Sequence, residues 1–184
     1  QPLTTLCDAK VIHLDTSVTG FYPTAEEIEK VITPNTKALM FCSPSNPTGK
    51  MCPADELAKI AEVVKKHQLW CVSDEIYSEL VYDEYKHTSI GSFPGMKDYT
   101  IVLNGFSKAF AMTGWRIGFL AAPKELVSEL HKLHQYNVIC APIFSQYGAI
   151  EGLRNGWAEV EKMRVSYRQR RNLMYKAFND MGLP

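Results

Sequence analysis

Apolar residues fall into two patterns along the chain: short continuous runs and stripes at helical spacing. Short runs bounded by turn-forming residues are typical of buried strands. These runs are Val11–Leu14, Lys37–Cys42, Leu69–Val72, Tyr99–Leu103 and Ile117–Ala121. The stripes predict helices over Thr24–Val31, Pro53–His67, Pro123–Tyr136, Pro142–Leu153 and from Asn155 onward. Because strands and helices alternate, the sequence predicts an α/β fold with a mostly parallel sheet and helices on both faces.

Local signals indicate where these helices begin and which side they bury. Thr24 and Glu27 fit a capping box, and Asn155 can cap the long C-terminal helix. Gly148 and Gly152 suit their helix for close packing. One apolar stripe should face the core; it consists of Leu57, Ile60, Ala61 and Val64. The arginines of the C-terminal helix are expected to form a solvated face; they are Arg164, Arg168, Arg170 and Arg171.

The composition of the chain mainly excludes classes of protein and of partner. The chain has 184 residues, of which 46% are hydrophobic and 22% charged, as is ordinary for one globular core. The formal net charge is zero, so charge does not indicate nucleic acid or an anionic membrane as a partner. No apolar run approaches the roughly 18 residues of a membrane span. We interpret the cysteines as reduced, mostly buried thiols of a cytoplasmic protein. They are Cys7, Cys42, Cys52, Cys71 and Cys140.

Polar motifs follow three of the predicted strands at the point where each strand ends. Asn46 comes after the second strand, Asp74–Tyr77 after the third and Ser107–Lys108 after the fourth, with Arg116 a short apolar run later. The carboxyl ends of parallel strands lie along one edge of a sheet, where open α/β sheets bind their ligands. We therefore expect these groups to converge on one site.

The chemistry of this set is specific. A lysine just past a buried strand can lose its proton and attack a carbonyl group. A serine and an arginine can hold a phosphate, and a carboxylate can bind a protonated ring nitrogen. A phenol and an amide can bind a ring oxygen. Pyridoxal phosphate needs each of these contacts.

Three segments resemble motifs of the class I/II aminotransferases of the aspartate-aminotransferase superfamily, which are pyridoxal-phosphate enzymes of fold type I. They are Ser45–Gly49 (Ser-Asn-Pro-Thr-Gly), Ser73–Tyr77 (Ser-Asp-Glu-Ile-Tyr) and Ser107–Gly118, which ends in Gly-Trp-Arg-Ile-Gly. Their order and spacing are also family-like. The resemblance covers nearly the whole chain, which corresponds to about half of a full family member.

The resemblance assigns a role to each site residue. Lys108 resembles the lysine that holds the cofactor as an internal aldimine and later moves the substrate proton. Asp74 resembles the aspartate that keeps the pyridine nitrogen protonated. Tyr77 and Asn46 resemble the pair that binds the phenolic oxygen of the ring. Ser107 and Arg116 resemble the phosphate ligands. The resemblance also suggests a cis peptide bond between Asn46 and Pro47.

The resemblance extends to organisation and partners. Residues 1–154 correspond to part of the cofactor-binding large domain, and residues 155–184 to a connecting helix that leads to a small domain. The sequence is therefore expected to be a fragment of a longer homodimeric enzyme, with an exposed hydrophobic sheet edge and little turnover by itself. Its substrates would be an amino acid and a 2-oxo acid.

Other interpretations remain open at this point. Each site residue taken alone could be a cap, a turn residue or a surface ion pair. A carbon–sulfur β-lyase would use the same residues, because the surrounding site decides which bond breaks. An aminotransferase-like sensor domain of a transcription regulator is a further alternative. His131 and His134 lie three residues apart without a third ligand nearby, so we expect no metal site.

Overall fold

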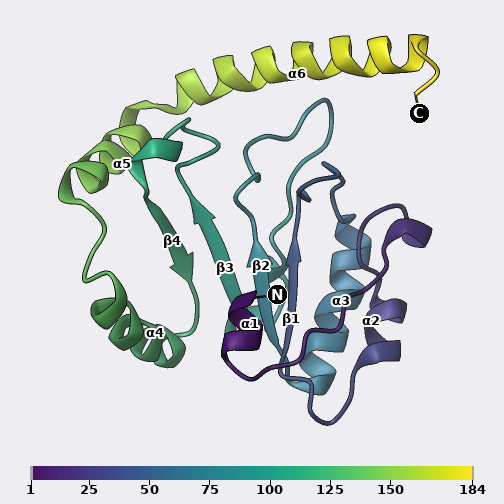
Figure 1. Ribbon diagram of the computed structural model, residues 1–184, viewed down its shortest axis with the longest axis vertical. Coiled ribbons are helices and arrows are strands. Elements are labelled where there is room, and N and C mark those ends of the chain that lie inside the picture. Colours follow the sequence, from purple (N-terminus) through teal and green to yellow (C-terminus); the bar gives the residue numbers. More distant parts are fainter. Residues whose placement is uncertain (1, 184) are drawn as a thin grey trace.

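A four-stranded mixed sheet forms the centre of the protein in a computed structural model that describes residues 2–183 (Figure 1). The strands are β1 (Ala38–Cys42), β2 (Trp70–Asp74), β3 (Thr100–Gly105) and β4 (Gly118–Ala121), in the order β1-β2-β3-β4. The first three run parallel, and β4 runs antiparallel to β3. The predicted α/β fold with a mostly parallel sheet is confirmed.

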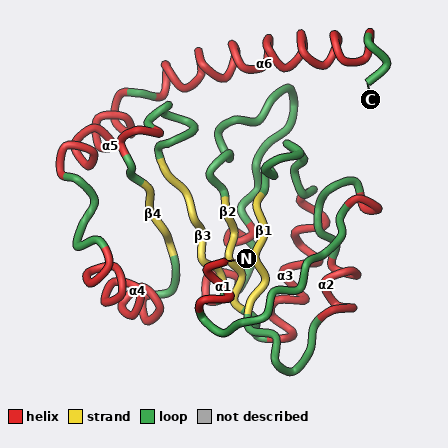
Figure 2. Tube along the Cα trace, viewed as in Figure 1, coloured by secondary structure: helices red, strands yellow, loops and turns green. Residues whose placement is uncertain are grey.

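Helices flank the sheet and connect its strands. They are α1 (Pro2–Leu6), α2 (Ala25–Val31), α3 (Ala54–His67), α4 (Lys124–Asn137), α5 (Ile143–Asn155) and α6 (Trp157–Asp180). Short 3-10 turns are η1 (Ser17–Thr19), η2 (Ile90–Ser92), η3 (Met96–Asp98) and η4 (Thr113–Trp115). Figure 2 shows α2 and α3 grouped beyond β1, with α4 and α5 beyond β4. Among the helices of residues 2–183, none is both long and apolar enough to cross a membrane.

The main hydrophobic core lies between α3 and the sheet. The predicted stripe of α3 is buried there, with Ile60 and Val64 fully inaccessible to solvent, beside Cys71 of β2. At the start of α2, the hydroxyl of Thr24 accepts a hydrogen bond from the Glu27 amide over 3.3 Å, as its capping role requires. The amphipathic pattern therefore predicted correctly which face of α3 is buried, and the capping motif predicted correctly where α2 begins.

A second, smaller core joins α5 to the loop between β3 and β4. Phe106 and Met112 of the loop are buried there together with Ala149 of α5. A Cβ added to Gly148 would lie 2.8 Å from the ring of Trp115, so only glycine allows this close approach. This packing confirms the interpretation of α5 as a close-packing helix, and it anchors the loop that carries Lys108.

Two predicted elements are absent or different. Val11–Leu14 forms no strand, although Leu14 packs against the main core. A strand needs a neighbour for its backbone hydrogen bonds, and within residues 2–183 this segment pairs with none of the strands. Asn155 does not cap α6 but ends α5, where its amide donates to Glu151 Oε1 over 2.8 Å. The N-cap of α6 is Gly156, which has no side chain.

Of two arginines of α6 that contact the loop after β2, Arg171 is exposed as expected, whereas Arg164 is half-buried, contrary to the sequence interpretation. Arg164 Nη1 donates to the Val81 carbonyl over 3.1 Å, and Arg171 Nη2 donates to Asp83 Oδ2 over 2.6 Å. Both contacts arise because α6 crosses the loop that follows β2. Figure 1 shows α6 lying beyond the carboxyl ends of the parallel strands.

The cysteines also differ in part from expectation. All of them are free thiols, but only Cys52 and Cys71 are buried. Cys7 and Cys140 are exposed because they lie in the connections after α1 and between α4 and α5.

At the sheet edge, β4 is exposed throughout, including 52% of Phe119.

Gly105→Ala is expected to destabilise the protein by about 1–3 kcal/mol, as overpacking does. Gly105 ends β3 opposite Gly118 of β4, and an added Cβ would lie 2.9 Å from the Gly118 Cα. Backbone cannot yield as a flexible side chain can. Urea unfolding measures the effect, with Gly114→Ala as the control, because a Cβ there meets nothing within 4 Å. Equal midpoints for the two variants would contradict this account.

Candidate functional site

The three polar motifs meet beyond the carboxyl ends of β1, β2 and β3. Asn46 Nδ2 lies 3.5 Å from the hydroxyl of Tyr77, within hydrogen-bond distance. The Lys108 ammonium lies 5.6 Å from the centre of the Tyr77 ring. Tyr77 therefore lies close both to a residue 31 positions earlier in the chain and to one 31 positions later, as the parallel topology predicts.

Asp74 ends β2 in the middle of this edge. Its register partners are Cys42 of β1 and Leu103 of β3. Its Oδ1 accepts a hydrogen bond from the Ile76 amide over 3.1 Å, which fixes the carboxylate at the start of the turn toward Tyr77. Burial raises the pKa of the neighbouring Cys42 thiol. A backbone hydrogen bond at Asn46 lowers this pKa in part, and the nearby Asp74 carboxylate raises it.

The loop after β3 presents Lys108 as a half-buried side chain. Phe106 and Met112 hold the loop at both ends, because the Met112 amide donates to the Phe106 carbonyl over 3.1 Å and both side chains are buried. Within the loop, the Ala111 amide donates to the Lys108 carbonyl over 3.2 Å. Core packing on each side of Lys108 therefore sets where its backbone lies.

Thr113 joins the backbone of Ser107 to the guanidinium of Arg116. Its hydroxyl donates to the Ser107 carbonyl over 3.0 Å, and its own carbonyl accepts from Arg116 Nη1 over 3.0 Å. Arg116 is exposed and has a left-handed backbone, with φ of 52°. The structure thus places Ser107 and Arg116 on one folded segment beside Lys108, whereas the contact described for the guanidinium is with Thr113. Sequence reasoning did not single out Thr113.

The loop after β1 has two cis peptide bonds. The predicted one, Asn46–Pro47, is confirmed, and Ser43–Pro44 is also cis. The loop closes between Ser45 and Lys50, because the Ser45 amide donates to the Lys50 carbonyl over 2.8 Å. This loop carries the Asn46 amide to Tyr77.

The assembled donors and acceptors suit a ring that carries a phosphate, a basic nitrogen, a hydroxyl and an aldehyde. Tyr77 and Asn46 offer adjacent polar groups for an oxygen, and the Asp74 carboxylate can accept from a protonated ring nitrogen. Lys108 supplies an amine next to Tyr77. The residues present therefore fit pyridoxal phosphate by their chemistry.

A buried polar network directly behind Asp74 was missed by sequence reasoning. Only 6% of the Glu75 side chain is exposed, and its carboxylate contacts Ser73, Ser89 and His87. The signal was present in the sequence: Ser73 and Glu75 alternate with Asp74, so they had to lie on the opposite side of the strand. The polar partners come from 12 and 14 residues further along the chain, beyond the reach of a local pattern.

Glu75 is expected to make stability depend on pH. Burial raises the pKa of its carboxyl, but hydrogen bonds from His87, Ser89 and Ser73 outweigh burial and hold the pKa below its usual range. A depressed pKa in the folded state stabilises the protein above the unfolded value of roughly 4.3. That contribution is lost as the pH falls through the folded-state pKa.

Chemical unfolding at a series of pH values between about 3 and about 6 measures this dependence. Glu75→Gln should flatten it, whereas Glu84→Gln, which changes an exposed carboxylate on the same loop, should leave it unchanged. An unaltered acid limb in Glu75→Gln would show that the network does not lower the pKa of Glu75.

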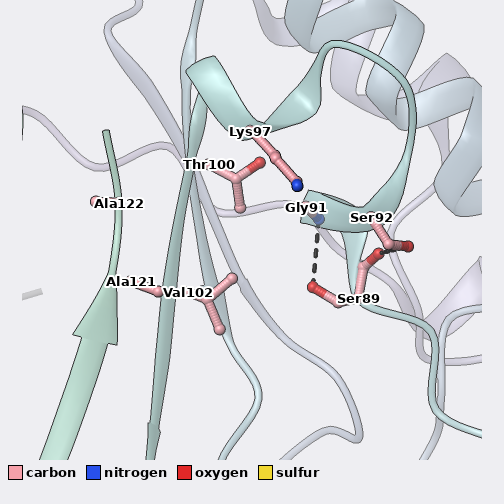
Figure 3. Close-up of a pocket in the computed structure, with 8 residues that line it drawn as sticks. All are labelled: Ser89, Gly91, Ser92, Lys97, Thr100, Val102, Ala121 and Ala122. Carbon is pink, nitrogen blue, oxygen red and sulfur yellow. Dashed lines mark hydrogen bonds between the residues drawn. The ribbon is translucent and has the colours of Figure 1, made fainter. Parts of the chain in front are cut away.

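A cleft lined by residues of β3, of the end of β4 and of the η2–η3 segment lies away from the candidate site. It has a volume of about 430 Å³, and Figure 3 shows its lining. Thr100 is the first residue of β3, and Ala121 is the last residue of the antiparallel β4. The cleft therefore lies at the opposite end of the sheet from Asp74, and none of its lining residues belongs to the predicted site.

Comparisons with known proteins agree with the motifs. Residues 2–184 match the family model for aminotransferase class I and II. The putative aminotransferase YugH of Bacillus subtilis is 51% identical over 182 residues, which cover 98% of this chain and 47% of that protein. Aromatic-amino-acid aminotransferase 2 of Thermococcus litoralis is 44% identical and is covered to 48%.

A solved structure is similarly close in fold. The aromatic aminotransferase of Pyrococcus horikoshii OT3 superposes with a TM-score of 0.95 at 41% identity, over 98% of this chain and 49% of that chain. The chain spans about half the length of the curated relatives it matches.

Proposed function

Because the chain belongs to the class I and II aminotransferases, we propose that it binds pyridoxal phosphate on Lys108 and serves transfer of an amino group between an amino acid and a 2-oxo acid. One observation carries the proposal: the Lys108 amine lies 5.6 Å from the centre of the Tyr77 ring, and the Asn46 amide lies 3.5 Å from the Tyr77 hydroxyl, on the turn that Asp74 begins. The names of similar aminotransferases support this function over that of a lyase or a sensor.

Each proposed ligand has a physical task. Asp74 would hold a proton on the ring nitrogen through a charge-assisted hydrogen bond. Tyr77 and Asn46 would bind the ring oxygen with their hydroxyl and amide groups. Ser107 and Arg116 would bind the phosphate, for which the guanidinium offers a planar pair of donors. Thr113 supports both, because its hydroxyl donates to the Ser107 carbonyl and its own carbonyl accepts from the Arg116 guanidinium.

Lys108 has two tasks in this proposal. Its amine would form the covalent link to the cofactor aldehyde with loss of water, and after release it would carry the proton that leaves the substrate carbon. The electron-poor ring, when bound, stabilises the charge that this proton leaves behind. The half-buried loop between Phe106 and Met112 limits the movement of the lysine backbone, so the amine stays near Tyr77.

The proposal includes the surroundings of the site. Residues 1–154 would form the cofactor-binding part, and α6 would connect it to a domain that binds the rest of the substrate. The contacts of Arg164 and Arg171 join α6 to the loop after β2, the loop that also carries Tyr77. We further propose a homodimer in the cytoplasm, consistent with the free thiols.

Titration of the purified chain with pyridoxal phosphate, followed by visible absorption, tests binding. Addition of L-phenylalanine or L-aspartate should then aminate the cofactor, and a 2-oxo acid should reverse the change. Release of ammonia together with a 2-oxo acid would instead identify an eliminating lyase. Because the chain by itself is expected to show little turnover, the amination test is made on a longer protein that includes residues 1–184. There, saturable binding without either reaction would contradict the proposed transfer, and absence of binding would contradict the proposed site.

A further inference from the structure

A buried polar network ties the turn that carries Asp74 and Tyr77 to a later segment of the chain. Glu75 Oε1 accepts from Ser73 Oγ over 3.0 Å and from Ser89 Oγ over 2.7 Å. Glu75 Oε2 lies 3.0 Å from His87 Nε2. The Ser89 hydroxyl also accepts from the Gly91 amide over 3.3 Å, a contact drawn in Figure 3. The carboxylate therefore has partners from both β2 and the segment that enters η2.

Backbone contacts place the same residue at the base of the turn. The Glu75 amide donates to the Leu103 carbonyl over 2.8 Å, next to the end of β3. The Glu75 carbonyl accepts from the Ser78 amide over 2.9 Å, which closes the turn around Tyr77. Asp74 Oδ1 is held within the same turn by the Ile76 amide. A displacement of Glu75 would therefore move both site residues.

The charge state of Glu75 determines the direction of the bond to His87. Hydrogen bonds keep the pKa of the Glu75 carboxyl low despite burial, so near neutral pH it is an acceptor only. His87 Nε2 must then carry a hydrogen and donate it. The other ring nitrogen, Nδ1, is buried without a hydrogen-bond partner among the described residues. The imidazole is thus held at one end, by Glu75.

We infer that Glu75 and His87 are positioning residues, whose hydrogen bond holds the turn at residues 74–78 in the conformation that presents the Asp74 carboxylate and the Tyr77 phenol to the cofactor. This inference rests on the proposed function for its purpose, but the positioning itself exists in the chain without cofactor. Neither residue touches the groups assigned to the cofactor; both act through the turn.

Three variants test the hydrogen bonds to Glu75, and the two at His87 distinguish loss of the Nε2 donor from loss of the imidazole ring. His87→Gln places an amide nitrogen about as far from the backbone as Nε2, whereas His87→Asn reaches only as far as Nδ1. Ser89→Ala is milder, because it removes one hydrogen bond to Glu75 and keeps the imidazole. Thr100→Val is the matched control, since it removes a 2.7 Å hydrogen bond to the Met96 carbonyl from a residue that is only 3% exposed and lies outside the turn, at the start of β3.

Amide hydrogen exchange in the cofactor-free chain is the first readout. The Ile76 and Ser78 amides report the turn, and the amides of Ile60 and Val64 in α3 report global opening. His87→Asn should speed exchange of the turn amides by about tenfold or more relative to α3, as loss of a charged hydrogen bond does. His87→Gln should restore most of the protection, Ser89→Ala should give a smaller local increase, and Thr100→Val should leave the turn unchanged.

The second readout is the affinity for pyridoxal phosphate from visible absorption. The affinity should fall most in the variant whose turn amides exchange fastest, His87→Asn, and less in Ser89→Ala and His87→Gln. The inference is overturned if the turn amides of His87→Asn and Ser89→Ala exchange no faster than those of Thr100→Val, or if they accelerate only together with α3. Because exchange is measured without cofactor, failure of the unaltered chain to bind pyridoxal phosphate would reject the proposed function separately.

Discussion

Lys108→Ala is expected to abolish covalent capture of pyridoxal phosphate by the chain. Alanine has no amine, so the absorption of the bound cofactor should disappear and hydride reduction should fix no label at this position. Phe106 and Met112, rather than the lysine side chain, anchor the loop in the second core. The folded structure should therefore persist, and the loss should be specific to the chemistry.

Lys50→Ala is the matched control for this experiment. Lys50 is an exposed lysine in the loop that carries Asn46, so it lies on the same edge of the sheet. Its removal should leave both the spectrum and the label unchanged. If Lys108→Ala retained the spectrum of the unaltered chain, or if Lys50→Ala lost it, Lys108 would not be the reactive lysine.

Asp74→Asn is expected to weaken pyridoxal phosphate binding by about 10-fold to 100-fold. The substitution keeps the shape of the side chain but removes the charge, and hydrogen bonds to charged groups contribute about 1.5–3 kcal/mol. If the ring nitrogen loses its proton as a result, turnover should fall by about 10²-fold to 10³-fold, as on loss of one electrostatic contact at a reacting group. Equilibrium titration and the rate of cofactor amination measure the two effects.

Asp83→Asn controls for a general effect of charge on the loop after β2. Asp83 is exposed, and its carboxylate pairs with Arg171 of α6 rather than with a residue of the proposed site. Its replacement should change cofactor affinity by less than about twofold, because exposed ion pairs contribute little. Equal losses in the two variants would indicate an electrostatic effect of the whole loop rather than a contact made by Asp74.

The parts of the fold that sequence reasoning found correctly depend on local signals. The stripe of α3 and the cap at Thr24 repeat over a few residues, and the motifs after β1, β2 and β3 follow from strand ends. The convergence of Asn46, Tyr77 and Lys108 then required only parallel topology.

The parts that failed depend on distant partners. Val11–Leu14 has a strand-like composition but no neighbouring strand in the described sheet. Asn155 has a capping side chain, yet it is the last residue of α5 rather than the N-cap of α6, so the position of the helix boundary decided its role. The partners of Glu75 lie on another segment, and a buried carboxylate in a strand-like position was the only local indication of them.

The most direct test of the account is to reduce the chain with borohydride after incubation with pyridoxal phosphate and to map the modified lysine by mass spectrometry. The account predicts one label per chain, on Lys108, that saturates with cofactor concentration and is absent after denaturation. A label spread over exposed lysines such as Lys50 and Lys97, or none on Lys108 at saturation, would contradict the proposed site.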